Sequence, residues 1–290
     1  RLIMLKYKCN LLKIICIFII AIFLFPTICI ASESIYTWSN NAKPLTETIP
    51  TNATTSLSLN VGSAVLIEQN SGQVLYNQNM HEKLRPASVT KVMTILLIME
   101  AIDSGKLSYT DKIPCSEKAA GMGGSQIWLD VREELTVDEM LKAICVVSAN
   151  DCTVAMAEYL AGSEEAFVNQ MNAKAKELGM NDTTFKNCHG IDEDGHVTSA
   201  YDIALMSREL LTKHPSITKY TTIYMDSLRD GKSSLVNTNK LVRNYKGATG
   251  LKTGSTSVAL YNLSASATRN NLNLIAVIMK APTTALRFSE

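Results

Sequence analysis

The 290-residue sequence predicts an α/β fold of the α+β type, in which helices flank an antiparallel sheet. Three observations predict this class. A hairpin pattern lies at residues 64–76, helical patterns fill most of 86–213, and strand patterns return between about 252 and 278. The sheet should therefore be built from both ends of this body, with a helical lobe inserted between the strands.

The first elements are a hairpin and a long helix. Apolar runs at 64–67 and 74–76 flank Asn70-Ser71-Gly72, a combination typical of a β-hairpin. A helical pattern then begins at Pro86 and extends to about Ser104. Its apolar residues cover nearly the whole circumference, so we expect a buried central helix rather than a surface one.

More helices follow before the chain returns to strands. Thr136 and Glu139 have the spacing of a capping box, which should open a helix that runs to about Val147. Further helical patterns span 150–161, 163–178 and 199–213. The last third is strand-like at 263–267 and 272–278, and Asn270-Asn271 should form the turn between these two strands.

Composition and charge exclude two classes of protein. Hydrophobic residues make up 46% and charged residues 19%, which excludes a mainly disordered chain. The formal net charge of +1 excludes a strongly basic nucleic-acid binder, so no nucleic-acid partner is expected. The first 31 residues carry four basic and no acidic groups, and the remainder holds 24 basic and 27 acidic groups. The body is therefore mildly acidic.

Residues 1–31 have the order of a secretory signal peptide. Lys6, Lys8 and Lys13 precede an apolar run from Ile14 to Phe25, and Cys29-Ile30-Ala31 then offers a cleavage site. The alternative is an uncleaved membrane anchor, for which the run is at the short limit. Either reading predicts that the body works outside the cytoplasm, on the extracytoplasmic face of the membrane or in the cell wall.

The exported part divides into a linker and one domain. Residues 32–60 are rich in Ser, Thr, Asn and Pro without periodicity, which indicates a flexible linker. Residues 61–290 should form a single domain. Of the seven cysteines, four lie in this domain, and we expect them to be free thiols: Cys115, Cys145, Cys152 and Cys188.

The first chemical motif is Ser88-Val89-Thr90-Lys91. Residues three apart share a helix face, so the hydroxyl and the amine can touch. Burial of this helix should lower the pKa of Lys91 towards the neutral amine that can act as a base. The motif alone is weak, because Ser216-Ile217-Thr218-Lys219 matches it too. That second copy follows a proline in a polar stretch and is interpreted as solvated surface.

Two more motifs follow in order. Ser148-Ala149-Asn150 lies between two apolar helices and is either a plain helix N-cap or a pair of side chains aimed into a cleft. Lys252-Thr253-Gly254 occurs once in the chain and begins a strand. A glycine within a strand allows another backbone or a ligand to approach closely.

Together the three motifs resemble the signature of the penicillin-recognising serine enzymes, whose fold is shared by β-lactamases and transpeptidases. Longer stretches resemble the D-alanyl-D-alanine carboxypeptidases, the low-molecular-mass penicillin-binding proteins. These stretches are Ser148–Asp151, Phe167–Asn172, Glu177–Met180 and Gly250–Thr256. The resemblance runs from about Val61 to Glu290. The sequence departs from the family pattern at Val258 and Leu260 and at Val131-Arg132-Glu133, which should lie on the rim of the cleft.

The resemblance implies a role for each motif residue. Ser88 would be the nucleophile, Lys91 the general base and Ser148 a proton relay to the leaving amine. The backbone N–H groups of Ser88 and Ser255 would form the oxyanion hole. The remaining substrate-binding residues would be Asn150, Lys252, Thr253, Gly254, Ser255 and Arg287. Arg287 matches the position of an arginine near the substrate carboxylate, but it fits equally well as a surface residue at a frayed end.

The implied activity is removal of the terminal D-alanine from peptidoglycan stem pentapeptides in cell-wall synthesis and the control of cell shape. β-Lactam antibiotics would acylate Ser88 in the same way. No cofactor is implied. In this family a β-rich domain and an amphipathic membrane-binding helix usually follow, so membrane association is expected through the leader or through a segment beyond Glu290.

Several alternatives stay open. A β-lactamase shares the motifs and adds a glutamate that activates water; Glu165 has a suggestive spacing but is interpreted as helix surface. A transpeptidase or endopeptidase on the same scaffold and a non-catalytic penicillin-binding sensor are further alternatives. Cys188, His189 and His196 match no standard zinc pattern, so no metal site is predicted.

Overall fold

The computed structural model describes residues 57–289. Its centre is a five-stranded antiparallel sheet in the order β2-β1-β9-β8-β7. The strands are β1 (Ser63–Glu68), β2 (Val74–Gln78), β7 (Ala248–Thr256), β8 (Leu260–Arg269) and β9 (Leu272–Ala281). The prediction of an antiparallel sheet assembled from both ends of the body is confirmed. The predicted signal peptide at 1–31 and most of the predicted linker at 32–60 lie outside the described residues.

The hairpin of β1 and β2 forms as the apolar alternation predicts. Gly72, in the turn, has a φ of 75°, a conformation that glycine adopts without a steric penalty. In β1, Val65 and Ile67 belong to the main core, whereas Ala64 belongs to a smaller cluster with Ile278 and Ala281 of β9. Because side chains alternate along a strand, the sheet buries apolar residues on both faces.

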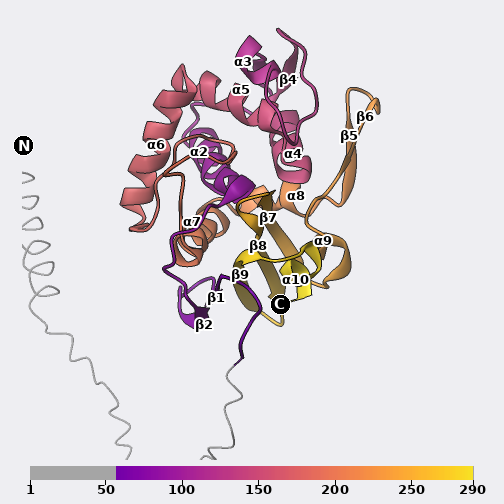
Figure 1. Cartoon of the computed structure of the whole chain (residues 1–290). Helices are drawn as coiled ribbons and strands as arrows, with labels where there is room; N and C mark the ends of the chain where they lie inside the picture. The colour runs from indigo at the N-terminus through magenta and orange to yellow at the C-terminus, as the bar shows by residue number, and fades with distance from the viewer. Residues whose placement is uncertain (1–56, 290) are drawn as a thin grey trace, which may run out of the picture. The chain divides into compact units, whose positions relative to one another are not determined.

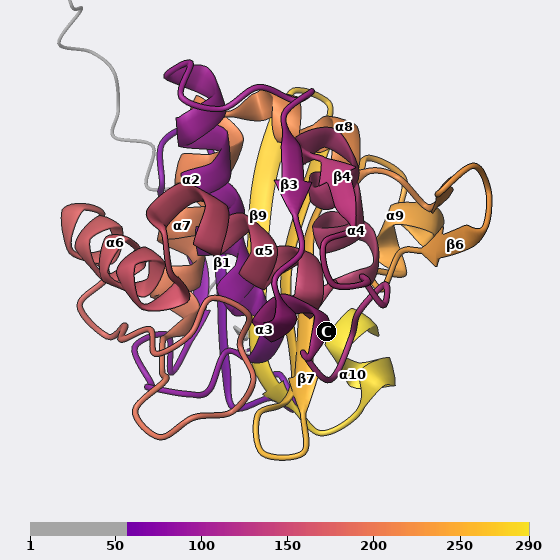
Figure 2. The ribbon, with the colours of Figure 1, turned by 90° about the horizontal axis from the view of Figure 1, so that it is seen from above.

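Two long helices cover one face of the sheet, and a short one covers the other. α2 (Lys91–Asp103) and α7 (Ala200–Lys213) pack beside each other, with α7 against β1 and β9 (Figures 1 and 2). The short α10 (Thr284–Ser289) packs on β8 and β9. The prediction that the helix after the hairpin is central is confirmed, because eight of its thirteen residues are buried. α2, which begins with Lys91 of the first motif, therefore lies on one face of the sheet.

The helical lobe is inserted between β2 and β7, as predicted. Its main helices are α4 (Val137–Val147), α5 (Asn150–Ala161) and α6 (Glu164–Glu177), which Figure 1 shows above and to the left of the sheet. The Thr136–Glu139 capping box is present in full and begins α4. The smaller elements were not predicted individually: β3 (Lys112–Pro114), α3 (Glu117–Ala120), β4 (Glu134–Thr136), η2 (Pro215–Ile217), α8 (Thr218–Thr221), β5 (Met225–Leu228), β6 (Ser233–Val236) and α9 (Leu241–Asn244).

The start of the central helix differs from its prediction. The sequence pattern indicates one α-helix from Pro86, but the chain first forms a 3₁₀ turn, η1 (Ala87–Thr90), and α2 begins only at Lys91. Ala87 has a φ of 49°, so the chain enters the turn from a left-handed residue. A 3₁₀ turn has three residues per turn, and side chains three apart are eclipsed. This tighter turn places position 88 directly over position 91.

Two further observations concern the described residues as a whole. The four cysteines between residues 57 and 289 are all free and buried, in agreement with the expectation of free thiols. Within that same range, none of the helices combines the length and the apolarity needed to cross a membrane.

Candidate active site

The three motifs meet where β7 passes η1. A Cβ atom added to Gly254 would lie 2.8 Å from Pro86 O, from Ser88 N and from Val89 N. Only a residue without a side chain allows the strand and the 3₁₀ turn to approach this closely. The prediction that this glycine permits close approach of another backbone is confirmed, and the neighbour is the segment that contains Ser88.

The side chains of Ser88 and Lys91 touch. Lys91 Nζ lies 3.0 Å from Ser88 Oγ, 2.6 Å from Asn150 Oδ1 and 2.7 Å from the carbonyl oxygen of His189. The two carbonyl oxygens can only accept hydrogen bonds. A neutral amine has two hydrogens and one lone pair, so donation to these two oxygens directs the lone pair at the Ser88 hydroxyl.

Burial favours the neutral form of this amine. Lys91 has no exposed surface. Burial, and in second place the positive charge of Lys252, hold the pKa of Lys91 well below its ordinary value. Because a neutral lysine can accept a proton, the site contains a hydroxyl with a base in contact with it. The contact between Ser88 and Lys91 and the lowered pKa of Lys91, both predicted from the first motif, are therefore found.

Asn150 faces the site, and neither Ser148 nor Asn150 is the N-cap of a helix. The residue at the N-cap of α5 is Ala149, and its side chain makes no capping bond, so the plain N-cap interpretation of this motif is wrong. Ser148 has a φ of 65°, and its buried Oγ has no hydrogen-bond partner in the part of the chain that the structure describes. Asn150 accepts from Lys91 and donates through Nδ2 to Gly123 O at 2.7 Å. A buried hydroxyl without a hydrogen-bond partner lowers the stability of the fold, unless a ligand or a water molecule forms that hydrogen bond.

β7 contributes the third motif. Lys252 is 1% exposed, and burial, with a further contribution from Arg287, lowers its pKa to about 7. Its Nζ donates to Thr253 O at 2.8 Å. Thr253 Oγ1 and Thr238 Oγ1 lie 2.7 Å apart, and this bond joins β7 to the segment that follows β6. Ser255 is exposed on the same strand.

The structure places Arg287 beside this strand. Its side chain is buried, and Nη1 donates to Gly254 O at 3.4 Å. The guanidinium also stacks over Tyr261 at 5.4 Å from the ring centroid. Its Nε is buried and has no hydrogen-bond partner among the described residues. The position is not that of a surface residue at a frayed end, the other interpretation that the sequence left open.

The competing sequence features lie outside this cluster. Ser216 and Lys219 are exposed, as expected for the second copy of the first motif. Glu165 is exposed on α6, as expected for helix surface. In residues 57–289, His, Cys, Asp and Glu side chains form no group of three or more arranged to hold a metal ion.

Sequence reasoning missed several residues that shape the site. The carbonyl oxygen of His189 is a direct hydrogen-bond partner of Lys91. Glu164, which precedes the exposed Glu165, is a buried carboxylate on α6. Backbone acceptors carry no signal in a sequence motif. Glu133 of the divergent segment forms an ion pair with Arg229, with Nε–Oε1 at 2.6 Å.

Fold and site together define the class of the penicillin-recognising serine proteins. Comparison with protein-family models matches residues 50–283 to the peptidase S11 family, D-alanyl-D-alanine carboxypeptidase. The chain belongs to this family. It is 56% identical over 233 residues to D-alanyl-D-alanine carboxypeptidase DacF of Bacillus subtilis (strain 168), covering 79% of this chain and 60% of that protein.

Other relatives agree in sequence and in structure. DacC of Escherichia coli (strain K12) is 36% identical, with 78% of this chain and 58% of that protein covered. The crystal structure of penicillin binding protein 5 from Haemophilus influenzae has a TM-score of 0.77 and 33% identity, over 81% and 69% of the two chains. The ampicillin-bound form of penicillin-binding protein D2 from Listeria monocytogenes has a TM-score of 0.72 and 30% identity, over 80% and 94%. The chain spans about three fifths of the length of the curated relatives it matches.

Proposed function

We propose that this protein is a serine-type D-Ala-D-Ala carboxypeptidase that removes the terminal D-alanine from peptidoglycan stem pentapeptides. The observation that carries the proposal is the contact between Ser88 and a buried Lys91 whose other two hydrogen bonds go to obligate acceptors. That arrangement suits nucleophilic catalysis by a serine with a lysine base. Membership of the peptidase S11 family supplies the substrate class.

The first half of the reaction forms an acyl-enzyme. Ser88 Oγ attacks the carbonyl carbon of the penultimate D-alanine while Lys91 takes the hydroxyl proton. The peptide bond to the last D-alanine then breaks, and Ser148 relays a proton to the departing amine. The free Oγ of Ser148 supports this role, because it has no competing partner among residues 57–289. Water hydrolyses the ester in the second half, which regenerates Ser88.

Substrate binding is assigned to β7 and its neighbours. β7 is at the end of the sheet and pairs only with β8 among the described strands, so an extended peptide can add to its other edge. Backbone N–H groups of Ser88 and Ser255 would hold the oxyanion, and Asn150 the substrate amide. The terminal carboxylate would meet the side chains of Lys252, Thr253 and Arg287. Gly254 keeps the strand close to Ser88.

β-Lactams would acylate Ser88 by the same route, with the ring amide in place of the peptide bond. The exposed position of Glu165 disfavours a β-lactamase that relies on this carboxylate to activate water. We further propose that the protein acts outside the cytoplasm, after export by residues 1–31. Association with the membrane would come from that leader or from a segment beyond Glu290.

Intact-mass spectrometry after incubation with benzylpenicillin tests the proposal. The parent chain should gain one penicillin mass, and Ser88→Ala should gain none. Release of D-alanine from a synthetic pentapeptide, measured in parallel, should occur with the parent alone. Rapid penicillin hydrolysis without D-alanine release would identify a β-lactamase instead. A folded parent that gains no adduct and leaves penicillin intact would leave only a non-catalytic module.

A further inference from the structure

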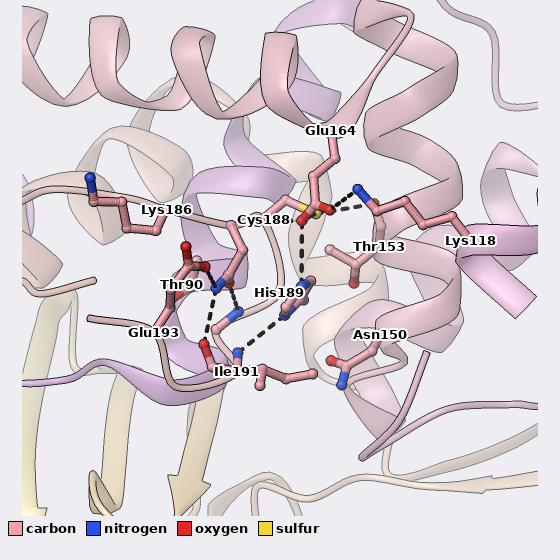
Figure 3. A network of polar contacts seen from close by, with 12 residues as sticks. Thr90, Lys118, Asn150, Thr153, Glu164, Lys186, Cys188, His189, Ile191 and Glu193 are labelled. Carbon is pink, nitrogen blue, oxygen red and sulfur yellow. Dashed lines mark hydrogen bonds and ion pairs between the residues drawn. The ribbon is translucent and has the colours of Figure 1, made fainter. Parts of the chain in front are cut away.

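The buried carboxylate of Glu164 contacts the segment whose His189 carbonyl bonds to Lys91. Glu164 is the first residue of α6 and is 8% exposed. Its Oε1 accepts the backbone N–H of Cys188 at 3.1 Å and the Cys188 thiol at 3.2 Å, and it lies 3.4 Å from His189 Nε2. Its Oε2 pairs with Lys118 Nζ at 2.6 Å. Figure 3 shows these contacts converging on the one side chain.

The carboxylate is held in its ionised form. Burial opposes ionisation, but the hydrogen bonds from Lys118 and from the Cys188 N–H outweigh it and keep the pKa of Glu164 below its ordinary value. Its position at the start of α6 adds the favourable end of the helix dipole. A charged acceptor forms stronger hydrogen bonds than a neutral one, so Glu164 is a firm attachment point for the segment that contains Cys188.

That segment carries the acceptor for Lys91. Cys188 is followed by His189, whose carbonyl oxygen receives the hydrogen bond from Lys91 Nζ. On the other side, Thr94 Oγ1 donates to Cys188 O at 2.7 Å. Cys188 is therefore fixed at both its N–H and its carbonyl oxygen, one residue before the His189 carbonyl.

The imidazole of His189 strengthens the same attachment. His189 Nδ1 accepts the backbone N–H of Ile191 at 3.1 Å, which places the ring proton on Nε2, facing Glu164. The peptide after His189 is fixed as well, because Gly190 N donates to Asn187 Oδ1 at 2.7 Å. The His189 carbonyl thus has one available direction, towards Lys91.

We propose that Glu164 is a positioning residue for catalysis: by anchoring Cys188 and His189 it sets the His189 carbonyl that orients the Lys91 amine. The inference rests on the proposed function, because it assigns Lys91 as the base. Glu164 touches neither Ser88 nor any group assigned to the substrate. Its loss should therefore slow the covalent step and leave non-covalent binding of the ligand almost unchanged.

Stopped-flow acylation with a fluorescent penicillin separates these two quantities in the 290-residue chain. Glu164→Ala should lower the rate constant of acylation by about 10- to 100-fold, the cost of a small misplacement of reacting groups. The dissociation constant of the non-covalent complex should stay within about twofold, as expected for a group that changes only the chemical step. Glu165→Ala, the adjacent exposed carboxylate, should match the parent in both quantities.

Two conservative variants test whether Glu164 acts through its hydrogen bond to the Cys188 N–H. In Glu164→Gln an amide oxygen still accepts the Cys188 N–H, so acylation should stay within about fivefold of the parent. Cys188→Ala removes the thiol and keeps the N–H, so acylation should stay within about threefold. If acylation of Glu164→Gln or of Cys188→Ala is as slow as that of Glu164→Ala, Glu164 does not act through its hydrogen bond to the Cys188 N–H, and the proposal is wrong.

The final extent of labelling distinguishes positioning from a general folding defect. Glu164→Ala should reach one penicillin per molecule, only slowly. Fewer labelled molecules that react at the parental rate would indicate a purely structural role and overturn the inference, as would an unchanged rate. A parent chain that is never acylated would instead overturn the proposed function.

Discussion

The backbone nitrogen of Ser88 lies so close to Gly254 that a Cβ atom on the glycine would be 2.8 Å from it. The two residues are 166 positions apart in the sequence, yet their backbones pack against each other. Gly254→Ala should therefore push β7 away from η1. We expect a loss of about 1–3 kcal/mol in the free energy of unfolding, typical of overpacking, with slower penicillin acylation.

Thermal unfolding and the acylation rate check this prediction together. Gly123→Ala is the matched control, because a Cβ at Gly123 meets no atom within 4 Å. Acylation of Gly254→Ala at the parental rate would show that the strand and the 3₁₀ turn are free to separate.

A second prediction concerns the charge of Lys91. Lys91→Arg keeps a positive side chain but removes the amine lone pair, because arginine stays protonated in proteins. Loss of a general base typically lowers a rate by about 10²–10⁴-fold, and acylation should fall by that amount. Lys219→Arg, in the exposed second copy of the motif, should leave the rate unchanged. Rapid acylation of Lys91→Arg would exclude proton transfer to this residue.

A third prediction follows from the pKa of Lys252, which burial lowers to about 7. Lys252 loses its positive charge as the pH rises through that value, so binding of a ligand carboxylate should weaken above about pH 7. A bound carboxylate stabilises the ammonium form of Lys252, so Lys252 loses its charge at a higher pH in the complex than in the free protein. The non-covalent dissociation constant for penicillin, measured from pH 6 to 9, should rise in the parent. In Lys252→Arg it should stay flat, since the charge persists.

A fourth prediction concerns acid stability. Burial lowers the pKa of His196 to about 4, and its Nδ1 accepts the Lys186 N–H at 2.9 Å, so a proton on Nδ1 would face another donor. Its Nε2 lies 2.7 Å from Thr90 Oγ1, inside η1. Burial also lowers the pKa of His189 to about 4. Because the unfolded chain binds these protons near the ordinary value of 6.5, stability is complete above that pH and falls as the pH drops towards 4.

Urea unfolding at pH 7, 5.5 and 4.5 measures this loss, which should reach a few kcal/mol at about 1.4 kcal/mol per pKa unit for each group. His196→Gln should show a smaller change between pH 7 and 4.5 than the parent. An identical pH dependence in His196→Gln would mean that other groups carry the acid sensitivity.

The parts of the fold and site that the sequence predicts are those with local signals. The hairpin around Gly72 and the capping box at Thr136 follow from spacing alone. The contact between Ser88 and Lys91 follows from a separation of three residues, although the turn is 3₁₀ rather than α. In each case the physical cause lies within a few residues of the chain.

The parts that escape prediction depend on distant contacts. Of the two neighbouring glutamates on α6, Glu164 is the buried one because it faces Lys118 and Cys188. The sequence does not show which of the two faces them. The His189 carbonyl is a backbone group, which any residue type supplies. The sequence does not decide between the two interpretations of Arg287, because its environment comes from β7 and β8 and α10 is too short to show a pattern.

The pairing of β1 with β9 has a consequence for the order of folding. The register joins Ser63 to Met279, so β1, the first of the described strands, can pair only after β9, the last of them, is available. Such long loops close late and make folding slow. Ser88 and Lys91 acquire their β7 neighbour only after some 160 further residues have followed them. Under the proposed function, a growing chain would not be acylated until its final strands are available, so reactivity towards penicillin would report on completion of the sheet.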